Sequence, residues 1–269
     1  MAQTQGVSVC IAGATGWTGR ALVRGVLDAP DMTLRSAVAR SAAGRDLGEA
    51  LGEAALGIPV HGTVADALDG VDVLIDYTSA TAVKPNTLAA IEAGVAVVIG
   101  TSGLTADDYA EIDTAARERP VGVVASGNFS LTAAMAAAAA LLAARHLPHW
   151  EVIDYASATK PDAPSGTARE LAERLAEVRA PAAPVPVDEV LGQREARGAS
   201  VAGSQIHSLR LPSFVVSTEV VFAAPGERLS IRHDAGETPA PYVAGTLLAI
   251  RSVVGRTGLT RGLDRLLGA

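Results

Sequence analysis

The chain has 269 residues, of which 49% are hydrophobic and 3% aromatic, and its net charge is −7. An acidic chain without a basic cluster is unsuited to nucleic acid, and a single cysteine excludes an intrachain disulfide and a cysteine-based zinc site. Residues 1–6 lack the pattern of a secretory signal, and the most apolar helical candidate, residues 132–144, is too short to span a membrane. We therefore expect a soluble cytoplasmic protein with no nucleic-acid or membrane partner.

The first half of the chain alternates short apolar runs with helical patterns. Runs rich in β-branched residues are found at residues 7–12, 33–39, 71–77, 95–100 and 121–126, and helical patterns at 21–27, 83–93 and 106–117. This alternation is typical of parallel βαβ units, and apolar runs without polar alternation indicate strands that are buried on both faces. The sequence predicts an α/β fold with a Rossmann-like, doubly wound parallel sheet.

After Asn128 the pattern changes to that of an α+β domain. The elements expected here are a helix at about 131–145, a strand at 151–156, a helix after Ser165, strands at 205–211, 215–223 and 229–233 in an antiparallel sheet, and helices at 242–254 and 259–267. We expect the last two helices to return to the first domain. A dinucleotide-binding domain is therefore placed at residues 1–127 plus about 240–269, with an inserted α+β domain at 128–239.

A glycine-rich turn follows the first predicted strand and opens the next helix. In such a turn Gly13 permits the sharp bend, Gly16 lets the backbone approach a pyrophosphate, and Gly19 allows close packing of helix and strand. The alternative is a purely structural turn. We predict that the whole loop binds a dinucleotide, with contacts from Gly13, Ala14, Thr15, Gly16, Trp17, Thr18 and Gly19.

The end of the second predicted strand bears on the choice between NADH and NADPH. Sites that prefer NAD usually carry an acidic residue here, to hold the ribose hydroxyls, but this chain has Ala39 followed by Arg40 and Ser41. Arginine binds phosphate bidentately, although an arginine in a loop is often only solvated. We predict NADPH as the preferred cofactor, with NADH also possible, and contacts from Arg40 and Ser41.

Three more loops follow predicted strands at their carboxyl ends, where ligands bind in doubly wound sheets. Each of these loops could instead serve only to cap a helix. We expect the loops to contact the cofactor through Tyr77, Thr78, Gly100, Thr101, Ser126, Gly127, Asn128 and Phe129, and the substrate through Ser102.

A lysine and a turn precede the helix that follows Ser165. Either Asp162 or Ser165 can cap that helix, and the free N–H groups of Ser165, Gly166 and Thr167 at its start can hold an anion. Lys160 adds a positive charge, so we predict a clamp for a substrate carboxylate. The alternative is a capped surface helix beside a solvated lysine. The five histidines lack metal-ligand spacing, and no metal is predicted.

Together these residues resemble the dihydrodipicolinate reductase family over almost the whole chain. The segments that carry the resemblance are Gly13 to Gly19, Ile99 to Gly103, Ser126 to Ser130, Lys160 to Ala168, Ile206 to Pro212, Ala224 to Glu227 and Ile231 to Asp234. The resemblance implies a Rossmann-like domain and an inserted domain that holds the substrate and builds a homotetramer through its sheet. It also implies that NAD(P)H delivers hydride to a cyclic, unsaturated dicarboxylate held by Lys160, which is also the catalytic candidate, and by residues 165–167.

The chain departs from the family pattern where that pattern has a pair of histidines, one of them the presumed proton donor. Ala156 and Ser157 occupy these positions, and Glu237-Thr238 stands where the family tends to carry an arginine. Loss of a positioned acid typically costs about 10²–10⁴-fold in rate. Three functions stay open: a reductase of another imine or activated alkene, which we favour; the family reaction of lysine biosynthesis, with Lys160, Tyr155 or water as the acid; and a cofactor-binding protein without catalysis.

Overall fold

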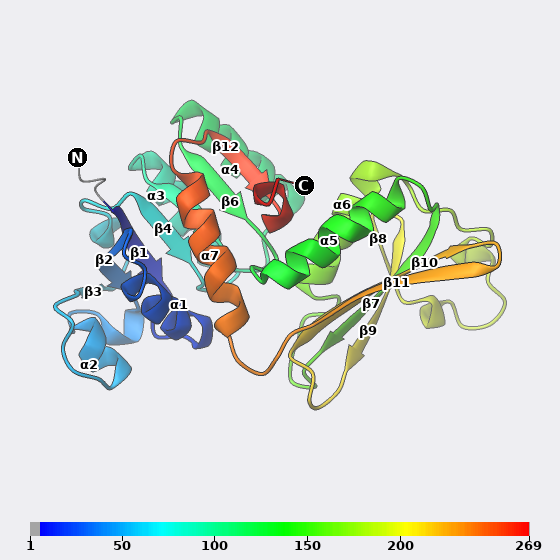
Figure 1. Cartoon of the computed structure of the whole chain (residues 1–269), viewed down its shortest axis with the longest axis horizontal. Helices are drawn as coiled ribbons and strands as arrows, with labels where there is room; N and C mark the ends of the chain where they lie inside the picture. Colours follow the sequence, from blue (N-terminus) through cyan, green and yellow to red (C-terminus); the bar gives the residue numbers. More distant parts are fainter. Residues whose placement is uncertain (1–5, 269) are drawn as a thin grey trace. The chain divides into compact units, whose positions relative to one another are not determined.

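The computed structural model describes residues 6–268 and divides the chain into two compact units (Figure 1). The first unit runs to Leu131 and resumes at Pro239, and the second comprises Thr132–Thr238. Within the described range, every helix is too short or too polar to cross a lipid bilayer.

The described part of the first unit is built on a seven-stranded parallel sheet with the strand order β12-β6-β5-β4-β1-β2-β3. The strands are β1 (Val7–Ala12), β2 (Met32–Val38), β3 (Val60–His61), β4 (Val73–Asp76), β5 (Ala96–Ile99), β6 (Gly122–Ala125) and β12 (Gly258–Arg261). The helices are α1 (Trp17–Leu27), α2 (Leu47–Leu51), α3 (Val83–Glu92), α4 (Ala106–Glu118) and α7 (Ala240–Val253). The predicted doubly wound parallel sheet is confirmed.

Helices cover both faces of this sheet, with α1 and α7 on one face and α3 and α4 on the other (Figure 1). The central strands are therefore apolar throughout, and all four residues of β4 and of β5 are buried. The chain builds β2 and β3 on one side of β1 and then crosses to β4 on the other side. This reversal creates a switch point between β1 and β4, where the carboxyl ends of the strands open a site for a ligand.

The C-terminal segment differs from its prediction. Residues 259–267 were expected to form a helix, but they provide strand β12 and a short 3₁₀ helix, Leu263–Leu266. The glycines on either side of β12, Gly258 and Gly262, have φ angles of 82° and 94°, which interrupt a regular helix. Pairing of β12 with the open edge of β6 outweighs the helical spacing of the leucines.

The second unit has a five-stranded sheet within its residues 149–234, in the order β11-β10-β7-β9-β8. Its strands are β7 (His149–Ala156), β8 (Ala199–Val201), β9 (Ser204–Arg210), β10 (Val216–Ala224) and β11 (Glu227–Asp234). The sheet was predicted to be antiparallel, but β7 and β9 are parallel, so the sheet is mixed. The reason is that the chain crosses over through helix α6 (Gly166–Val178) between these two strands.

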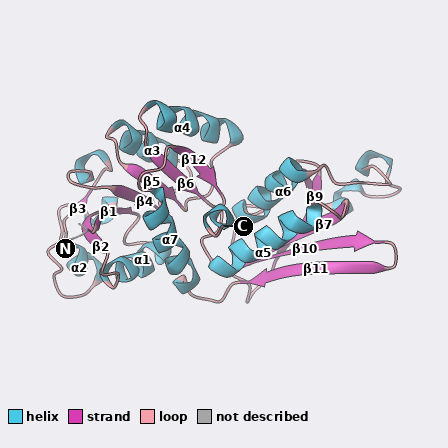
Figure 2. Ribbon diagram, turned by 45° about the horizontal axis from the view of Figure 1, so that its top comes forward, coloured by secondary structure: helices cyan, strands magenta, loops and turns pink. Residues whose placement is uncertain are grey.

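Helices α5 (Leu131–Ala144) and α6 pack on one face of this sheet (Figure 2). Burial alternates along β7, because Trp150, Val152 and Ala156 point toward the helices while Ile153 and Tyr155 point to the other face. The core between the sheet and the helices contains Phe222 and the small alanine side chains of α5 and α6. The far side of the sheet carries no α-helix of this unit, but part of it is covered by the segment 181–197, which ends in the 3₁₀ helix Arg194–Arg197.

Candidate active site

The glycine-rich turn between β1 and α1 forms a cradle for a dinucleotide. Gly13 has a φ of 84°, and a Cβ atom there would overlap the carbonyl oxygen of Tyr77. A Cβ atom at Gly19 would overlap the carbonyl oxygen of Gly13, so turn and helix lie in direct backbone contact. Gly16 precedes α1 without a side-chain cap, and the N–H groups of the first helical turn are available to a pyrophosphate. The backbone geometry therefore fits the group that the sequence predicts.

The side chains of this loop differ in what they offer to a ligand. Ala14 is fully buried, so it can contribute only its backbone, while Trp17 is 52% exposed. The Trp17 ring packs edge-on against Tyr242 of α7, with 6.1 Å between the ring centroids. The carbonyl oxygen of Thr15 accepts a hydrogen bond from Arg20 Nε at 3.1 Å, which fixes the loop to the second turn of α1.

A cleft of about 510 Å³ extends from the glycine turn to the end of β2. Of the predicted residues, it is lined by Gly13, Thr15, Gly16, Arg40, Ser41, Tyr77 and Thr78. It is also lined by residues that sequence reasoning did not assign to the cofactor: Val38, Ala39, Gly62, Thr63, Val64, Ser79, Ala82 and Asn86. Arg40 is exposed and forms no hydrogen bond or ion pair with residues 6–268, so its guanidinium group is available to a ligand.

Two of the predicted aromatic residues have their side chains in the core of the first unit. The Tyr77 ring fills the space beside Gly100, where a Cβ atom would overlap it, and its hydroxyl lies 3.1 Å from Thr246 Oγ1. Burial raises the pKa of the Tyr77 phenol well above its usual value. Phe129 is 1% exposed and packs against Tyr77 with 6.1 Å between the ring centroids. Phe129 can therefore approach a cofactor only through its backbone atoms, whereas Tyr77 is partly buried and also lines the cleft.

The loops after β4, β5 and β6 are connected by hydrogen bonds at the carboxyl edge of the sheet. The Thr78 N–H donates to Thr101 Oγ1 at 2.8 Å, and the Ser126 N–H donates to the carbonyl oxygen of Ile99 at 3.2 Å. Within the third loop, the Ser126 hydroxyl donates to the carbonyl oxygen of Asn128 at 2.9 Å. Predicted cofactor residues from three separate loops are thus brought together. Ser102, the predicted substrate residue, is exposed in the loop between β5 and α4.

The predicted carboxylate clamp lies in the second unit, at the start of α6. Ser165 is the N-cap of this helix, and its hydroxyl accepts a hydrogen bond from the Ala168 N–H at 3.3 Å. One expectation is wrong: the Ser165 N–H is not free for an anion, because it donates to Asp154 Oδ2 at 2.8 Å. Gly166, the first residue of α6, follows directly, so a backbone contact to an anion would begin one residue later than expected.

Lys160 reaches the same turn and is held there by a neighbouring acid. Its Nζ lies 2.7 Å from Asp162 Oδ1, and its side chain is 27% exposed. The second carboxylate oxygen of Asp162 is buried and has no hydrogen-bond partner within the described chain. An anion that bound Lys160 would have to share or replace its contact with Asp162.

Arg210, the last residue of β9, forms hydrogen bonds that hold the turn between Lys160 and Ser165, which we call the clamp turn. Its Nη2 donates to Asp154 Oδ2 at 2.8 Å and to the carbonyl oxygen of Asp162 at 2.7 Å. Burial raises the pKa of Asp154, but hydrogen bonds from Ser165 and Arg210 outweigh this effect and hold the pKa below its usual value. Sequence reasoning included Arg210 only within a family motif and gave it no role. The available signal was an arginine at the end of a predicted strand.

The two positions where the family pattern has histidines carry no side chain that is a good proton donor at neutral pH. Ala156 is fully buried at the end of β7, and the Ser157 hydroxyl is bonded to the Thr159 hydroxyl at 3.0 Å. Tyr155 points to the opposite face of the sheet, where its hydroxyl donates to Glu219 Oε2 at 3.0 Å. Burial and this hydrogen bond raise the pKa of Tyr155. Of the two side chains that the sequence analysis named as substitute acids, Lys160 and Tyr155, only Lys160 lies at the clamp turn.

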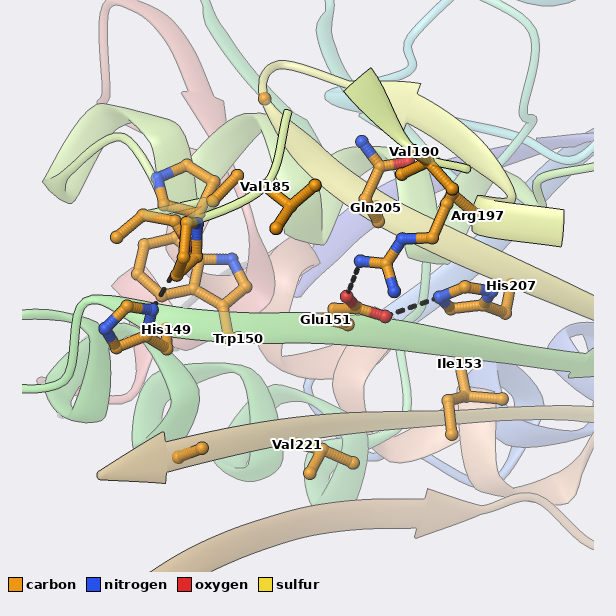
Figure 3. A pocket seen from close by; sticks show the side chains of 16 residues that line it. His149, Trp150, Glu151, Ile153, Val185, Val190, Arg197, Gln205, His207 and Val221 are labelled. Carbon is orange, nitrogen blue, oxygen red and sulfur yellow. Dashed lines mark hydrogen bonds and ion pairs between the residues drawn. The ribbon is translucent and has the colours of Figure 1, made fainter. Parts of the chain in front are cut away.

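A second cavity of about 630 Å³ lies on the face of the second sheet that carries no α-helix (Figure 3). At its centre Glu151 on β7 binds two side chains, with its carboxylate bridging Arg197 and His207. The His207 Nε2 lies 2.6 Å from Glu151 Oε2. The charged centre is surrounded by apolar side chains, among them Ile153 and Val185. The cavity lies on the other face of β7 from the clamp.

A parallel sheet with a glycine-rich turn at its switch point, followed by a second α+β unit, is the architecture of many pyridine-nucleotide-dependent oxidoreductases. Comparison with known proteins narrows this class. Residues 7–129 match the family described as "Dihydrodipicolinate reductase, N-terminus", and residues 127–267 match "Dihydrodipicolinate reductase, C-terminus". The chain therefore belongs to the dihydrodipicolinate reductase family.

Individual relatives agree over the full length of the chain. It is 39% identical to 4-hydroxy-tetrahydrodipicolinate reductase from Thermosynechococcus vestitus, covering 97% of both chains. It is 38% identical to the protein of the same name from Desulfitobacterium hafniense, covering 97% of this chain and 98% of the relative. The structure matches the dipicolinate-bound dihydrodipicolinate reductase from Paenisporosarcina with a TM-score of 0.77 and 29% identity, covering 97% of this chain and 99% of the other. The protein is thus an NAD(P)H-dependent reductase of this family.

Proposed function

We propose that the protein uses NADPH to transfer hydride to a C=N or activated C=C bond of a small, carboxylate-bearing substrate. The observation that carries the proposal is the clamp at the start of α6, where Lys160 and the helix N-terminus are held in place by the buried pair of Asp154 and Arg210. A cation beside the N-terminus of a helix is suited to a carboxylate. Lys160 and the helix N-terminus are both present in this turn, although Ala156 stands where the family pattern has an acid.

The cofactor would be held by the first unit. Gly13, Gly16 and Gly19 leave room for the pyrophosphate, and Arg40 at the far end of the cleft can bind the additional phosphate of NADPH with two donors. When bound, NADPH supplies the hydride. Tyr77 packs against Gly100 beside the cleft, and a hydrogen bond from the Thr78 N–H to Thr101 Oγ1 connects the loops after β4 and β5.

The second unit would orient the substrate. Lys160 binds a substrate carboxylate in exchange for Asp162, and the Gly166 N–H at the helix start adds a hydrogen-bond donor. Negative charge develops on the atom next to the one that receives hydride. Because Ala156 cannot protonate it, the preferred substrate is one that needs no enzymic proton there, such as a preformed iminium ion or a strongly activated alkene.

A second candidate is the reaction named for the relatives, that of 4-hydroxy-tetrahydrodipicolinate reductase in lysine and diaminopimelate biosynthesis. It is favoured by 39% identity over 97% of both chains. In this case Lys160 or a water molecule would supply the proton in place of the histidine. Lys160 would then have to combine two roles, because the clamp also needs its charge.

We also propose that the protein forms a homotetramer through the face of the second sheet that carries no α-helix. This face presents Ile153, Tyr155 and the cavity around Glu151. Burial of exposed apolar surface in an interface between subunits is favourable. Sedimentation equilibrium tests the proposal, with Ile153→Glu as the variant expected to dissociate the assembly. A wild-type monomer would contradict it.

The function is tested by NADPH oxidation with purified protein. The substrates are freshly generated 4-hydroxy-tetrahydrodipicolinate and a panel of cyclic imines, iminium ions and unsaturated carboxylic acids, each paired with its analogue lacking the carboxylate. We expect the best substrate to carry a carboxylate and to lose most of its kcat/KM when that group is absent. Turnover of the lysine-pathway substrate above all others would favour the second candidate instead.

A further inference from the structure

The last residue of β4, Asp76, is a fully buried carboxylate at the switch point of the sheet. Its Oδ1 accepts hydrogen bonds from the Thr78 N–H at 3.0 Å, the Thr78 hydroxyl at 2.7 Å and the Thr101 hydroxyl at 2.7 Å. Its Oδ2 accepts one from Asn86 Nδ2 at 2.8 Å. All four of these hydrogen bonds are directed at the carboxylate oxygens, an arrangement that suits a carboxylate acting only as an acceptor.

The negative charge of Asp76 has no cationic partner. No lysine, arginine or histidine within residues 6–268 forms an ion pair with it. Burial of a charge is costly unless it is paired, and a neutral asparagine could accept or donate the same hydrogen bonds at lower cost. The field of Asp76 reaches its neighbours, since it adds to the effect of burial in raising the pKa of Cys10 on β1 to about 12. A charge kept at this cost points to a role for the charge itself.

Asp76 lies under the cofactor cleft. It is paired in register with Ala12, the residue before Gly13, and two of its hydrogen-bond partners, Thr78 and Asn86, line the cleft. The third partner, Thr101, comes from the loop after β5. The carboxylate thus connects two strand-end loops and helix α3 at the point where a doubly wound sheet binds its nucleotide.

We propose that Asp76 positions the cofactor site and that its negative charge stabilises the oxidised nucleotide relative to the reduced one. The nicotinamide ring gains a positive charge when it gives up hydride, so a fixed negative charge in a water-poor site favours that form. The same charge increases the tendency of the bound reduced nucleotide to give up hydride. This inference rests on pyridine-nucleotide binding and not on which substrate is reduced.

The test is a pair of dissociation constants, for NADP⁺ and NADPH, measured by calorimetry without any substrate. Asp76→Asn removes the charge but not the hydrogen bonds, because the Asn86 amide can turn over and present its oxygen to the new amide nitrogen. We expect the ratio of the NADP⁺ to the NADPH dissociation constant to rise on the order of tenfold, because a unit charge in a partly desolvated site interacts with energies of about 1–2 kcal/mol.

The matched control is Asn86→Leu, which removes a hydrogen bond to Asp76 but keeps the charge. It should weaken both nucleotides equally and leave the ratio unchanged. An unchanged ratio in Asp76→Asn, or the same rise in Asn86→Leu, would overturn the proposal. If Asp76→Asn does not fold, as judged by circular dichroism, Asp76→Ser provides a second neutral variant with the same expected rise.

The result is separable from the function proposed above. Wild-type protein that binds neither nucleotide would overturn the cofactor site and this inference with it. Wild-type protein that binds both nucleotides but reduces no substrate contradicts only the proposed function, and the ratio still decides the role of Asp76.

Discussion

Asp154 and Arg210 form a buried ion pair beneath the carboxylate clamp, with 2.8 Å between Asp154 Oδ2 and Arg210 Nη2. Asp154 is on β7 and fully buried, and Arg210 ends the parallel neighbour β9. The same carboxylate oxygen accepts the Ser165 N–H, and the same guanidinium nitrogen donates to the carbonyl oxygen of Asp162. The pair thus holds the turn that carries Lys160 at Asp162 and at Ser165. A substitution that breaks the pair should therefore change both the stability of the second unit and the geometry of the clamp.

Replacement of Arg210 by methionine should destabilise the second unit strongly. The substitution leaves Asp154 as a buried charge with two hydrogen bonds and no counter-ion. Removal of one partner of a buried ion pair typically lowers the free energy of unfolding by about 3–5 kcal/mol. The free energy of unfolding, measured by urea denaturation, checks this. The double variant Asp154→Leu with Arg210→Met is the control, and it should recover much of the loss because no charge remains buried. Equal stability of wild type and Arg210→Met would show that the pair contributes nothing.

The same pair predicts how stability depends on pH. The folded-state pKa of Asp154 is lowered, because the hydrogen bonds from Ser165 and Arg210 outweigh its burial. A carboxyl group whose folded pKa is depressed contributes stability that is fully present above its unfolded pKa, about 3.9, and is lost as pH falls through the folded value. We therefore expect the melting temperature to fall below about pH 4 more steeply in wild type than in the Asp154→Leu, Arg210→Met variant. If the melting temperatures of the two proteins fell equally with decreasing pH, the lowered pKa of Asp154 would be contradicted.

Arg40→Ala should weaken NADPH far more than NADH. Arg40 lines the cleft and has no partner within the described residues, and its guanidinium group matches a phosphate. A hydrogen bond to a charged group is worth about 1.5–3 kcal/mol, so NADPH binding should weaken by about 10- to 100-fold. Arg45→Ala is the matched control, because Arg45 donates to the Glu49 carbonyl oxygen and does not line the cleft. Equal losses for NADPH and NADH in Arg40→Ala would falsify the assignment.

Local patterns predicted the first unit well. The glycine turn and the fully apolar strands are recognisable because their requirements lie within a few residues, and Gly13 and Gly19 have no space for a side chain in the structure. Strand β3 was missed because it is two residues long, and the cleft residues Gly62 and Thr63 that follow it were missed with it. Strand β12 was missed because its conformation depends on the edge of β6, which is far away in the sequence.

The clamp shows the limit of the same reasoning in the second unit. The lysine, the turn and the helix cap were all visible locally, and Ser165 does cap α6. The use of the Ser165 N–H by Asp154 was not visible, because that contact joins a strand to a turn eleven residues later. Arg210 is farther still in the sequence, so its position under the clamp becomes apparent only when β7 and β9 pair in parallel.

Lys160→Ala should abolish turnover while NADPH binding stays near normal. Lys160 and its partner Asp162 lie in the second unit, whereas the cofactor cleft is lined entirely by residues of the first. Calorimetry with NADPH and steady-state kinetics separate the two effects. Lys84→Ala is the matched control, since Lys84 is the other lysine of the chain and forms ion pairs with Asp108 and Glu111. Full activity of Lys160→Ala on a carboxylate-bearing substrate would show that the clamp is assigned wrongly.

The last prediction concerns the missing proton donor. Hydride transfer leaves negative charge on the conjugated partner of the atom that is reduced, and this charge must be neutralised or protonated. Ala156 offers no proton, and the Ser157 hydroxyl is bonded to Thr159 and is a poor acid at neutral pH. Tyr155 is on the opposite face of the sheet, so Lys160 is left to hold a carboxylate and give a proton at once. Turnover of the lysine-pathway substrate should therefore be weak or absent.

Introduction of the two histidines tests where this deficit lies. With freshly generated substrate and saturating NADPH, the variant Ala156→His, Ser157→His should gain activity, because a positioned acid is worth about 10²–10⁴-fold in rate. Ala156 is fully buried, so overpacking at that site should cost about 1–3 kcal/mol of stability, and the single variant Ser157→His controls for it. Wild-type turnover within the range of about 1–10³ s⁻¹ that is typical of enzymes would contradict the deficit. Unchanged activity in a correctly folded double variant would show that the proton comes from elsewhere, and Lys160 would then be the residue to examine by its pH–rate profile.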